Sequence, residues 1–138
     1  MRRQVRIPVV SSQLRWGIVL AVAGVIFVTS IVIAPLDAAL DPSFAPQDKL
    51  YHVLAYGAFG ISLAYTFTDR PVAVWKKATT VFVAAVTYGI GIELGQASLP
   101  ARSLEVGDAL ANAIGALLSL SWYLVQHRVK FVPADDYR

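Results

Sequence analysis

The sequence predicts an all-α membrane protein, a compact bundle of four transmembrane helices with both termini in the cytoplasm. Hydrophobic residues make up 57% of the 138 residues, a larger share than a soluble domain normally carries. They gather in four apolar stretches, near residues 16–34, 50–67, 74–94 and 106–125. Each stretch approaches the ~20 residues that cross the hydrocarbon core of a bilayer. The chain has room for one domain, which we expect at residues 14–125.

The basic residues give the orientation of the bundle. Ten of the twelve Lys and Arg residues flank the same ends of the four stretches: Arg2, Arg3, Arg6, Arg15, Arg70, Lys76, Lys77, Arg128, Lys130 and Arg138. Positive charge concentrates on the cytoplasmic side of membrane proteins, so these ends are predicted to be cytoplasmic. Trp16, Trp75 and Trp122 fall at the same ends, as in an aromatic belt at one membrane interface. A nucleic-acid partner is not expected, because no aromatic residues are interleaved with the basic ones.

The N-terminal segment is predicted to be a tail followed by a retained helix. Residues 1–13 are basic and are expected to lie in the cytoplasm against anionic lipid headgroups. The following apolar stretch resembles a secretory signal. It is longer than the ~7–15 residues of a signal core, however, and lacks a small-residue cleavage pattern. The sequence contains no cysteine, which excludes disulfides, thiolate metal sites and cysteine nucleophiles.

Turn and capping residues predict the loops and the helix starts. Segment 35–47 carries three prolines and is predicted to be an exterior loop. Asp48 is placed to cap the N-terminus of the second helix, and Pro71 suits the start of the third. An exterior loop at 95–105 leads into the fourth helix, and residues 126–138 are predicted to be a polar cytoplasmic tail without regular structure.

Strongly polar residues gather at the predicted exterior ends of three helices. Asp48, His52 and Tyr56 are spaced i, i+4, i+8 and therefore share one helix face. Glu93 with Gln96 and Asp108 with Asn112 form two further helical pairs, and the cations Lys49 and Arg102 lie beside them. Ionisable side chains at membrane depth are costly, so a group of them predicts a functional site. The predicted ligand-binding set is Asp48, Lys49, His52, Tyr56, Glu93, Gln96, Arg102, Asp108 and Asn112.

Three segments resemble the VanZ-like family. DKLYHVLAY (48–56), IELGQASLPARS (92–103) and GDALANAIGA (107–116) follow its ordered pattern D-K-x-x-H-x-x-x-Y, E-x-x-Q, R and D-x-x-x-N-x-x-G. The resemblance covers about residues 48–118; Ala101 and Ser119 stand where the family often has glycine. It implies a small integral protein of a bacterial cytoplasmic membrane. The family is named for a member linked to resistance against the glycopeptide teicoplanin, and that role is not carried over to this chain.

The polar residues allow several kinds of chemistry. His52 and Glu93 are candidate acid/base catalysts, or buried hydrogen-bonding partners. Lys49 and Arg102 are suited to holding a phosphate, or to balancing nearby carboxylates. Asp48, His52, Glu93 and Asp108 offer oxygen-rich metal ligation, but a single histidine without a metal-ligand spacing is weak support. We therefore predict no metal and no cofactor.

Three functions remain after these exclusions. The exterior polar pocket binds a cell-envelope component, such as a lipid-linked phosphate or a peptidoglycan-related ligand. Alternatively, the protein is a membrane enzyme that acts on such a lipid with His52 and Glu93 as acid and base. In the third alternative the polar network is structural, and the protein is a scaffold or a subunit of a membrane complex. Glycines along the helices predict packing within the bundle, with a homo-oligomer through Gly91 and Gly95 as the alternative.

Overall fold

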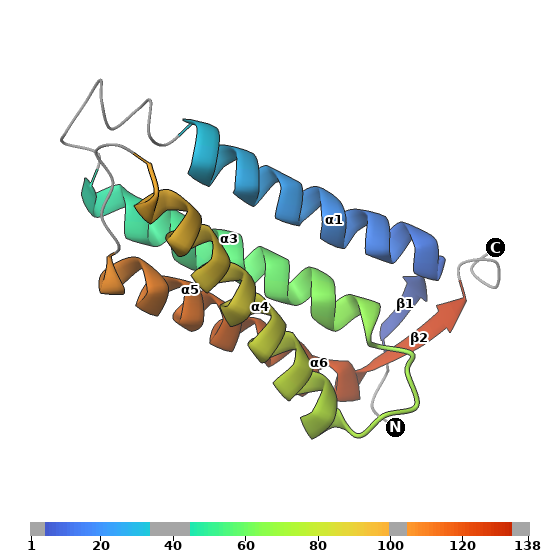
Figure 1. The fold of residues 1–138 in the computed structure, drawn as a ribbon. Helices are drawn as coiled ribbons and strands as arrows, with labels where there is room; N and C mark the ends of the chain where they lie inside the picture. Colours follow the sequence, from blue (N-terminus) through green and yellow to red (C-terminus); the bar gives the residue numbers. More distant parts are fainter. Residues whose placement is uncertain (1–4, 34–44, 100–104, 134–138) are drawn as a thin grey trace.

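The computed structural model describes residues 5–33, 45–99 and 105–133 and shows an antiparallel helical bundle (Figure 1). Helix α1 (Ser12–Val28) continues through a π-helical turn (Thr29–Ile33) and is followed by α3 (Ala45–Thr66) and α4 (Val74–Ala97). Helix α5 (Val106–Ser119) leads into α6 (Ser121–Val125) and a 3-10 turn (Gln126–Arg128). Short strands β1 (Val5–Val9) and β2 (Val129–Pro133) lie at the two ends of this order. The predicted all-helical bundle is confirmed, with the strand pair as an addition.

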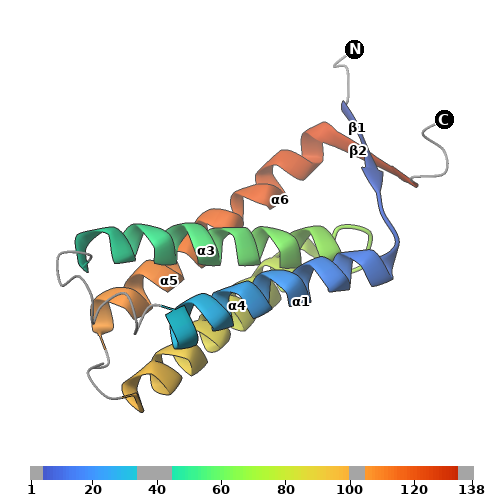
Figure 2. The same cartoon turned by 90° about the horizontal axis from the view of Figure 1, so that it is seen from above.

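The bundle has two chemically different ends. The strand end carries β1, β2 and the turn between α3 and α4 (residues 67–73). The polar end carries the start of α3, the end of α4 and the start of α5. Figure 2 shows that β1 and β2, the first and last described elements, lie side by side at the strand end.

Three helical segments in the described part of the chain are long and apolar enough to cross a membrane. They are Ser12–Ile33, Val74–Ala97 and Val106–Val125. Helix α3 has 22 residues but is more polar, because it lies in the middle of the bundle. It contacts α1, α4, α5 and α6, and it buries Tyr56, Phe59, Leu63 and Ala64. Three membrane-capable helices are thus observed where the sequence predicted four spans.

Large apolar side chains cover the outside of the bundle. Leu20, Leu117 and Leu124 are each at least 60% exposed, as are many apolar neighbours on the same helix faces. A soluble protein does not present so continuous an apolar surface to water. This surface therefore suits contact with lipid chains.

Helices α3 and α5 pack closely because small residues face one another. A Cβ atom on Gly115 would collide with the carbonyl oxygen of Val53 and would lie 2.9 Å from the backbone nitrogen of Gly57. One turn further along, the side chain of Ser119 lies directly against Gly60. Ser119 occupies a position where the resemblance led us to expect glycine, and Gly60 provides the missing space. The glycines predicted to pack within the bundle do so on these two helices.

The two tails contain secondary structure that the sequence analysis did not predict. Strands β1 and β2 pair in parallel, with Val5 opposite Val129 and Val9 opposite Pro133. The hydroxyl of Tyr65 on α3 donates to the Pro8 carbonyl at 3.1 Å. Each strand has only five residues, and its partner is at the opposite end of the sequence. Local patterns cannot reveal such a pairing.

Helix boundaries also differ from the predicted ones. Helix α1 begins within the predicted tail, at Ser12, and the side chain of Ser11 accepts a hydrogen bond from the Leu14 backbone nitrogen at 3.4 Å. Helix α3 begins at Ala45, so Asp48 is inside its first turns and the predicted N-cap role is wrong. Proline is tolerated in a first helical turn, which lets the helix start ahead of Asp48. Helix α4 extends to Ala97, past the predicted end at residue 94.

Contacts at the strand end join the helices through the turn between α3 and α4. Arg15, which is buried, donates two hydrogen bonds to the carboxylate of Asp69 at 2.8 and 2.6 Å. The indole nitrogen of Trp122 donates to the Thr68 hydroxyl at 3.2 Å. Trp16 makes an edge-to-face contact with Phe67. With Trp75 in the first turn of α4, the three tryptophans lie at one end of the bundle, as the sequence predicted.

Candidate functional site

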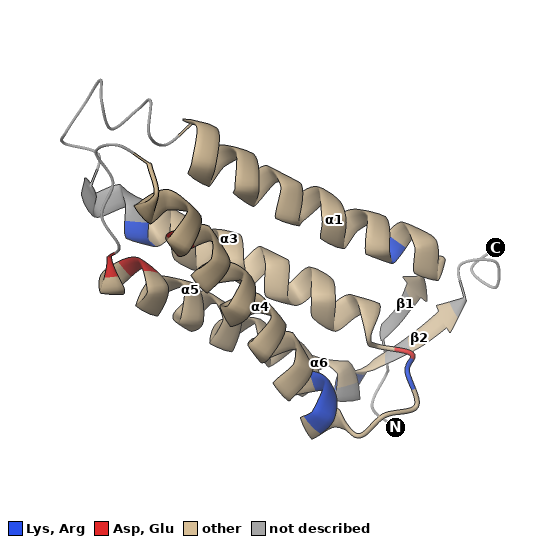
Figure 3. Ribbon diagram, in the orientation of Figure 1, with Lys and Arg blue, Asp and Glu red and all other residues tan. Residues whose placement is uncertain are grey.

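The bundle brings together most of the predicted site residues at its polar end. Seven of the nine have described side chains: Lys49, His52 and Tyr56 on α3, Glu93 and Gln96 on α4, and Asp108 and Asn112 on α5. The side chain of Asp48 and the whole of Arg102 lie outside the described residues. Charged residues of α3 and α5 mark this end in Figure 3. Apart from Lys49, the other six are at most 7% exposed.

A buried hydrogen-bonded chain links three helices. Nδ1 of His52 lies 2.8 Å from Oδ1 of Asn112, and Nδ2 of Asn112 donates to Oε1 of Glu93 at 3.4 Å. Because an amide oxygen only accepts hydrogen bonds, the proton of a neutral His52 is on Nδ1. Asn112 therefore fixes both the tautomer and the orientation of the imidazole ring. We call His52, Glu93, Asp108 and Asn112 the polar cluster.

Lys49 forms the rim of the polar cluster. Its ammonium group lies 3.1 Å from Oδ1 of buried Asp108 and 3.3 Å from Oε2 of exposed Glu105. The Lys49 side chain is 51% exposed, so this ion pair lies at the surface next to the buried residues of the cluster. Asp108 also reaches inward, with Oδ2 4.0 Å from Nε2 of His52. Glu105 was not among the predicted site residues, and this contact adds it to the rim.

Tyr56 and Gln96 flank the polar cluster, with Tyr56 one turn further into the bundle along α3 and Gln96 one turn nearer the end of α4. The Tyr56 ring is parallel to that of His52, with centroids 6.5 Å apart. Gln96 donates from Nε2 to the Ser30 carbonyl at 3.1 Å. Ser30 is in the π-helical turn, where the hydrogen-bond register of the helix shifts. Among the described residues, the Tyr56 hydroxyl and Oε1 of Gln96 are buried without a hydrogen-bond partner.

The chain matches the VanZ/LLP1 family over residues 16–127. This protein belongs to the VanZ/LLP1 family. The match covers the helical bundle from the first turns of α1 to the 3-10 turn after α6. No curated protein and no solved structure gave a significant match.

The residues that follow the VanZ/LLP1 family pattern include all four members of the polar cluster. The three sequence segments that resembled the family supply Lys49 and His52, then Glu93, then Asp108 and Asn112. The structure joins these segments through His52–Asn112, Asn112–Glu93 and Lys49–Asp108 contacts. A pattern dispersed along the sequence is therefore one connected group of side chains in the bundle.

Gly89 also shapes the site of this VanZ/LLP1 family member, and sequence reasoning missed it. A Cβ atom at Gly89 would lie 3.1 Å from both Nδ2 of Asn112 and Cε1 of Tyr56. Any side chain there would press against the amide that connects His52 to Glu93. An isolated glycine in an apolar helix gives no sequence signal of this kind.

Three residues of the cluster have the donor atoms that a metal ion needs. Ligand atoms of His52, Glu93 and Asp108 lie within 4.8 Å of one another. One nitrogen with several carboxylate oxygens suits a hard divalent cation such as Mg²⁺ or Mn²⁺. The same side chains also serve one another: His52 bonds to Asn112 and Asp108 bonds to Lys49. Both side chains therefore also have partners within the bundle.

The arrangement also permits proton transfer. Nδ1 of His52 contacts Asn112, and Nε2 lies 4.0 Å from the carboxylate of Asp108. Glu93 lies on the other side of the ring, with Oε1 3.9 Å from Nδ1. Histidine is the side chain that most often transfers protons in general acid–base catalysis, and Asp and Glu also do so.

Proposed function

We propose that this VanZ/LLP1-family membrane protein resides in the bacterial cytoplasmic membrane with four spanning helices and cytoplasmic termini. The support is the distribution of charge in Figure 3. Arg15, Arg70, Lys76, Lys77 and Arg128 all belong to the strand end, and positive charge marks the cytoplasmic side. In this orientation the polar end faces the exterior. Helix α3 is then the fourth span, shielded by α1, α4 and α5.

Its proposed function is to bind a cell-envelope component at the polar end. The observation that carries this proposal is the buried polar cluster built by three helices beneath the half-exposed Lys49. Burying two carboxylates and a histidine at this depth costs free energy that simple helix packing does not require. Such a group has a role beyond holding apolar helices together.

The chemistry of the site suits a lipid-linked phosphate that also carries hydrogen-bond donors. Lys49 at the rim supplies a cation for a phosphate, and Arg102 in the neighbouring connection would supply a second with bidentate geometry. Among the described residues, Glu93, Glu105 and Asp108 add acceptors. Carboxylates accept hydrogen bonds from the hydroxyl, amide and amine groups of sugars and peptides. Both features fit a polyprenyl phosphate with a peptidoglycan-type head.

A second candidate is an enzyme that acts on the same lipid. The contact between Nδ1 of His52 and Oδ1 of Asn112 favours it, because it orients a histidine ring, the commonest acid/base side chain, beside Glu93 and Asp108. Glu93 would be the partner acid or base. Lys49 and Arg102 would stabilise charge on the phosphate.

The test is a binding series on purified protein in detergent. The wild type and the His52→Ala, Glu93→Ala and Arg102→Ala variants are checked for monodispersity by size-exclusion chromatography. Each is then titrated with a polyprenyl phosphate and with a polyprenyl-diphosphate sugar. Arg128→Ala, which removes an exposed cation at the strand end, is the matched control for Arg102→Ala. We expect monodisperse variants that lose binding at least tenfold, and an unchanged Arg128→Ala protein.

Other outcomes of the binding series would favour the enzyme or the structural role of the cluster. Turnover of the lipid by wild type but not by His52→Ala supports the enzyme. If all three variants aggregate while Arg128→Ala does not, the cluster is structural. The protein is then a scaffold or a subunit of a larger membrane complex, and the ligand proposal is withdrawn.

A further inference from the structure

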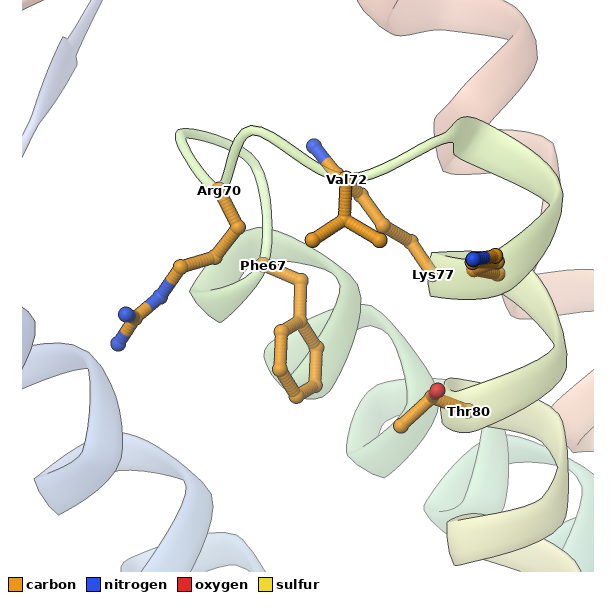
Figure 4. A pocket seen from close by; sticks show the side chains of 6 residues that line it. Phe67, Arg70, Val72, Lys77 and Thr80 are labelled. Carbon is orange, nitrogen blue, oxygen red and sulfur yellow. The ribbon is translucent and has the colours of Figure 1, made fainter.

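A second site is present at the opposite end of the bundle. A cavity of about 240 Å³ opens beneath the turn between α3 and α4. Its walls are Phe67, Arg70, Val72, Lys76, Lys77 and Thr80. Figure 4 shows Val72 on the turn with the Lys77 side chain reaching towards it, Phe67 and Thr80 below, and the Arg70 side chain leaving the turn in the opposite direction. Three of the six lining residues are cations, and none is acidic.

The nearest carboxylate, Asp69, attracts Arg70 and Lys77 but offsets only part of their charge, because it is shared with Arg15. Asp69 precedes Arg70, but both of its oxygens accept hydrogen bonds from Arg15, at 2.8 and 2.6 Å. Lys77 is buried and donates to the Thr68 carbonyl at 3.1 Å, a neutral partner that leaves its charge in place. The cavity therefore keeps a positive potential.

The helix beside the cavity adds to that potential. Helix α4 begins at Val74, and its N-cap residue Ala73 makes no side-chain capping bond. The N-terminus of a helix carries a partial positive charge and backbone N–H groups that favour anions. Lys76 and Lys77 belong to the same first turns, so dipole and side chains act together.

The surroundings of the cavity suit a lipid rather than a soluble ion. Val72, Val74 and Trp75 are 47%, 38% and 66% exposed around its opening. The ring of Trp75 lies under the Lys76 ammonium group at 5.4 Å. Exposed aliphatic and tryptophan side chains beside cations are typical of the membrane–water interface. The cavity is smaller than the ~300–1,000 Å³ of sites for drug-sized ligands, which is appropriate for a headgroup.

We propose that this cavity binds the phosphate group of an anionic membrane lipid through Arg70, Lys76 and Lys77. The lipid chains extend along the apolar outside of α3 and α4. This site is separate from the polar cluster and does not depend on the ligand proposed there. Basic hollows between membrane helices bind anionic headgroups in this way.

The experiment compares three probes on purified protein in detergent. Phosphatidylglycerol, zwitterionic phosphatidylcholine and inorganic phosphate are titrated, with native mass spectrometry and thermal unfolding as readouts. We expect a saturable phosphatidylglycerol adduct and a raised unfolding midpoint. The other two probes should have little effect. Equal stabilisation by phosphatidylcholine would overturn a site that recognises net negative charge. Equal binding of inorganic phosphate would overturn the lipid assignment.

Two kinds of variant locate the site. Arg70→Gln/Lys76→Gln removes two exposed cations without touching buried Lys77, and Thr80→Phe fills the cavity without changing charge. Each lysine or arginine near a lipid surface contributes about 1 kcal/mol, so the double variant should bind phosphatidylglycerol at least about tenfold more weakly. Arg128→Gln removes an exposed cation at the same end of the bundle, outside the cavity lining, and is the control that should bind as wild type. Retained affinity in both cavity variants would refute the proposal.

Discussion

Asn112 is the residue on which the polar cluster depends. It is 2% exposed and uses both ends of its amide, one towards His52 and the other towards Glu93. No other side chain in the described part of the chain bonds to both residues. Without it, the tautomer of His52 is no longer set by an amide oxygen.

Asn112→Ala is expected to destabilise the protein and to disturb the site. It removes two buried hydrogen bonds and leaves polar atoms of His52 and Glu93 less well satisfied. Losing such partners costs about 1–3 kcal/mol. Thermal unfolding in detergent measures the change. Ile114→Ala, on the exposed side of the same helix, is the control and should change the midpoint much less. Equal midpoints for the two variants would mean that the amide bridge carries little stability.

At the scale of the helices, the packing of α5 against α3 depends on Gly115. Its Cα faces the backbone of α3 so closely that even a methyl group collides with the Val53 carbonyl. Backbone atoms cannot rotate aside as side chains can, so the helices must separate. That separation would also move Asn112, one turn away, relative to His52.

Gly115→Ala is therefore expected to cost at least about 1–3 kcal/mol, the usual range for overpacking. Gly17→Ala is the matched control, because no atom lies within 4 Å of a Cβ at Gly17. There, alanine should stabilise the helix by up to ~1 kcal/mol through its higher helix propensity. Unfolding midpoints of both variants in the same detergent provide the comparison. A Gly115→Ala protein as stable as Gly17→Ala would contradict the observed closeness of α3 and α5.

The turn after α3 is fastened by a pH-dependent ion pair. The hydrogen bond from Arg15 holds the pKa of the Asp69 carboxyl below its ordinary value of 3.8. A carboxyl with a lowered folded-state pKa contributes stability above its unfolded pKa. That contribution is lost as the pH falls through the folded value. The pair should thus stabilise the protein at neutral pH and fade in strong acid.

Asp69→Asn is expected to lower the unfolding midpoint at neutral pH, because buried Arg15 loses its charged partner. Asp69 is 45% exposed, so solvent screening limits the loss to about 1 kcal/mol. The gap between wild type and variant should shrink from about pH 4 downward. Unfolding midpoints of both proteins, measured from neutral pH into acid, test whether the stabilisation by Asp69 is lost as the pH falls. A gap that widens in acid would show that the Asp69 carboxylate does not stabilise the fold through Arg15.

The sequence predicted the helices well and the connections poorly, for a physical reason. Apolar stretches and i, i+4 spacing are local, so the bundle and the common face of His52 with Tyr56 could be read directly. The β1–β2 pair joins segments from opposite ends of the chain, and no local pattern contains both. Gly89 matters only because Asn112 and Tyr56 approach it from other helices. The N-cap role predicted for Asp48 is wrong because Pro46 is tolerated in the first turn of α3, so the helix begins before Asp48.

At the scale of the whole molecule, the two ends of the bundle carry different kinds of polar residue. Polar side chains at one end form a buried network, while cations at the other surround an open cavity beside three tryptophans. The proposed orientation assigns the network to the exterior and the cavity to the cytoplasmic leaflet. An opposite orientation would exchange the two and remove the basis for an envelope ligand.

Because the chain contains no cysteine, single introduced cysteines can decide the orientation. Ser98 lies just beyond α4 at the polar end and is exposed, and Ala73 is exposed in the turn at the strand end. In intact cells, Ser98→Cys is expected to react with a membrane-impermeant maleimide, whereas Ala73→Cys should react only after permeabilisation. The positive-inside rule is the physical reason, since Arg70, Lys76 and Lys77 resist translocation. The reverse pattern would place the polar cluster at the cytoplasmic face and refute the proposed topology.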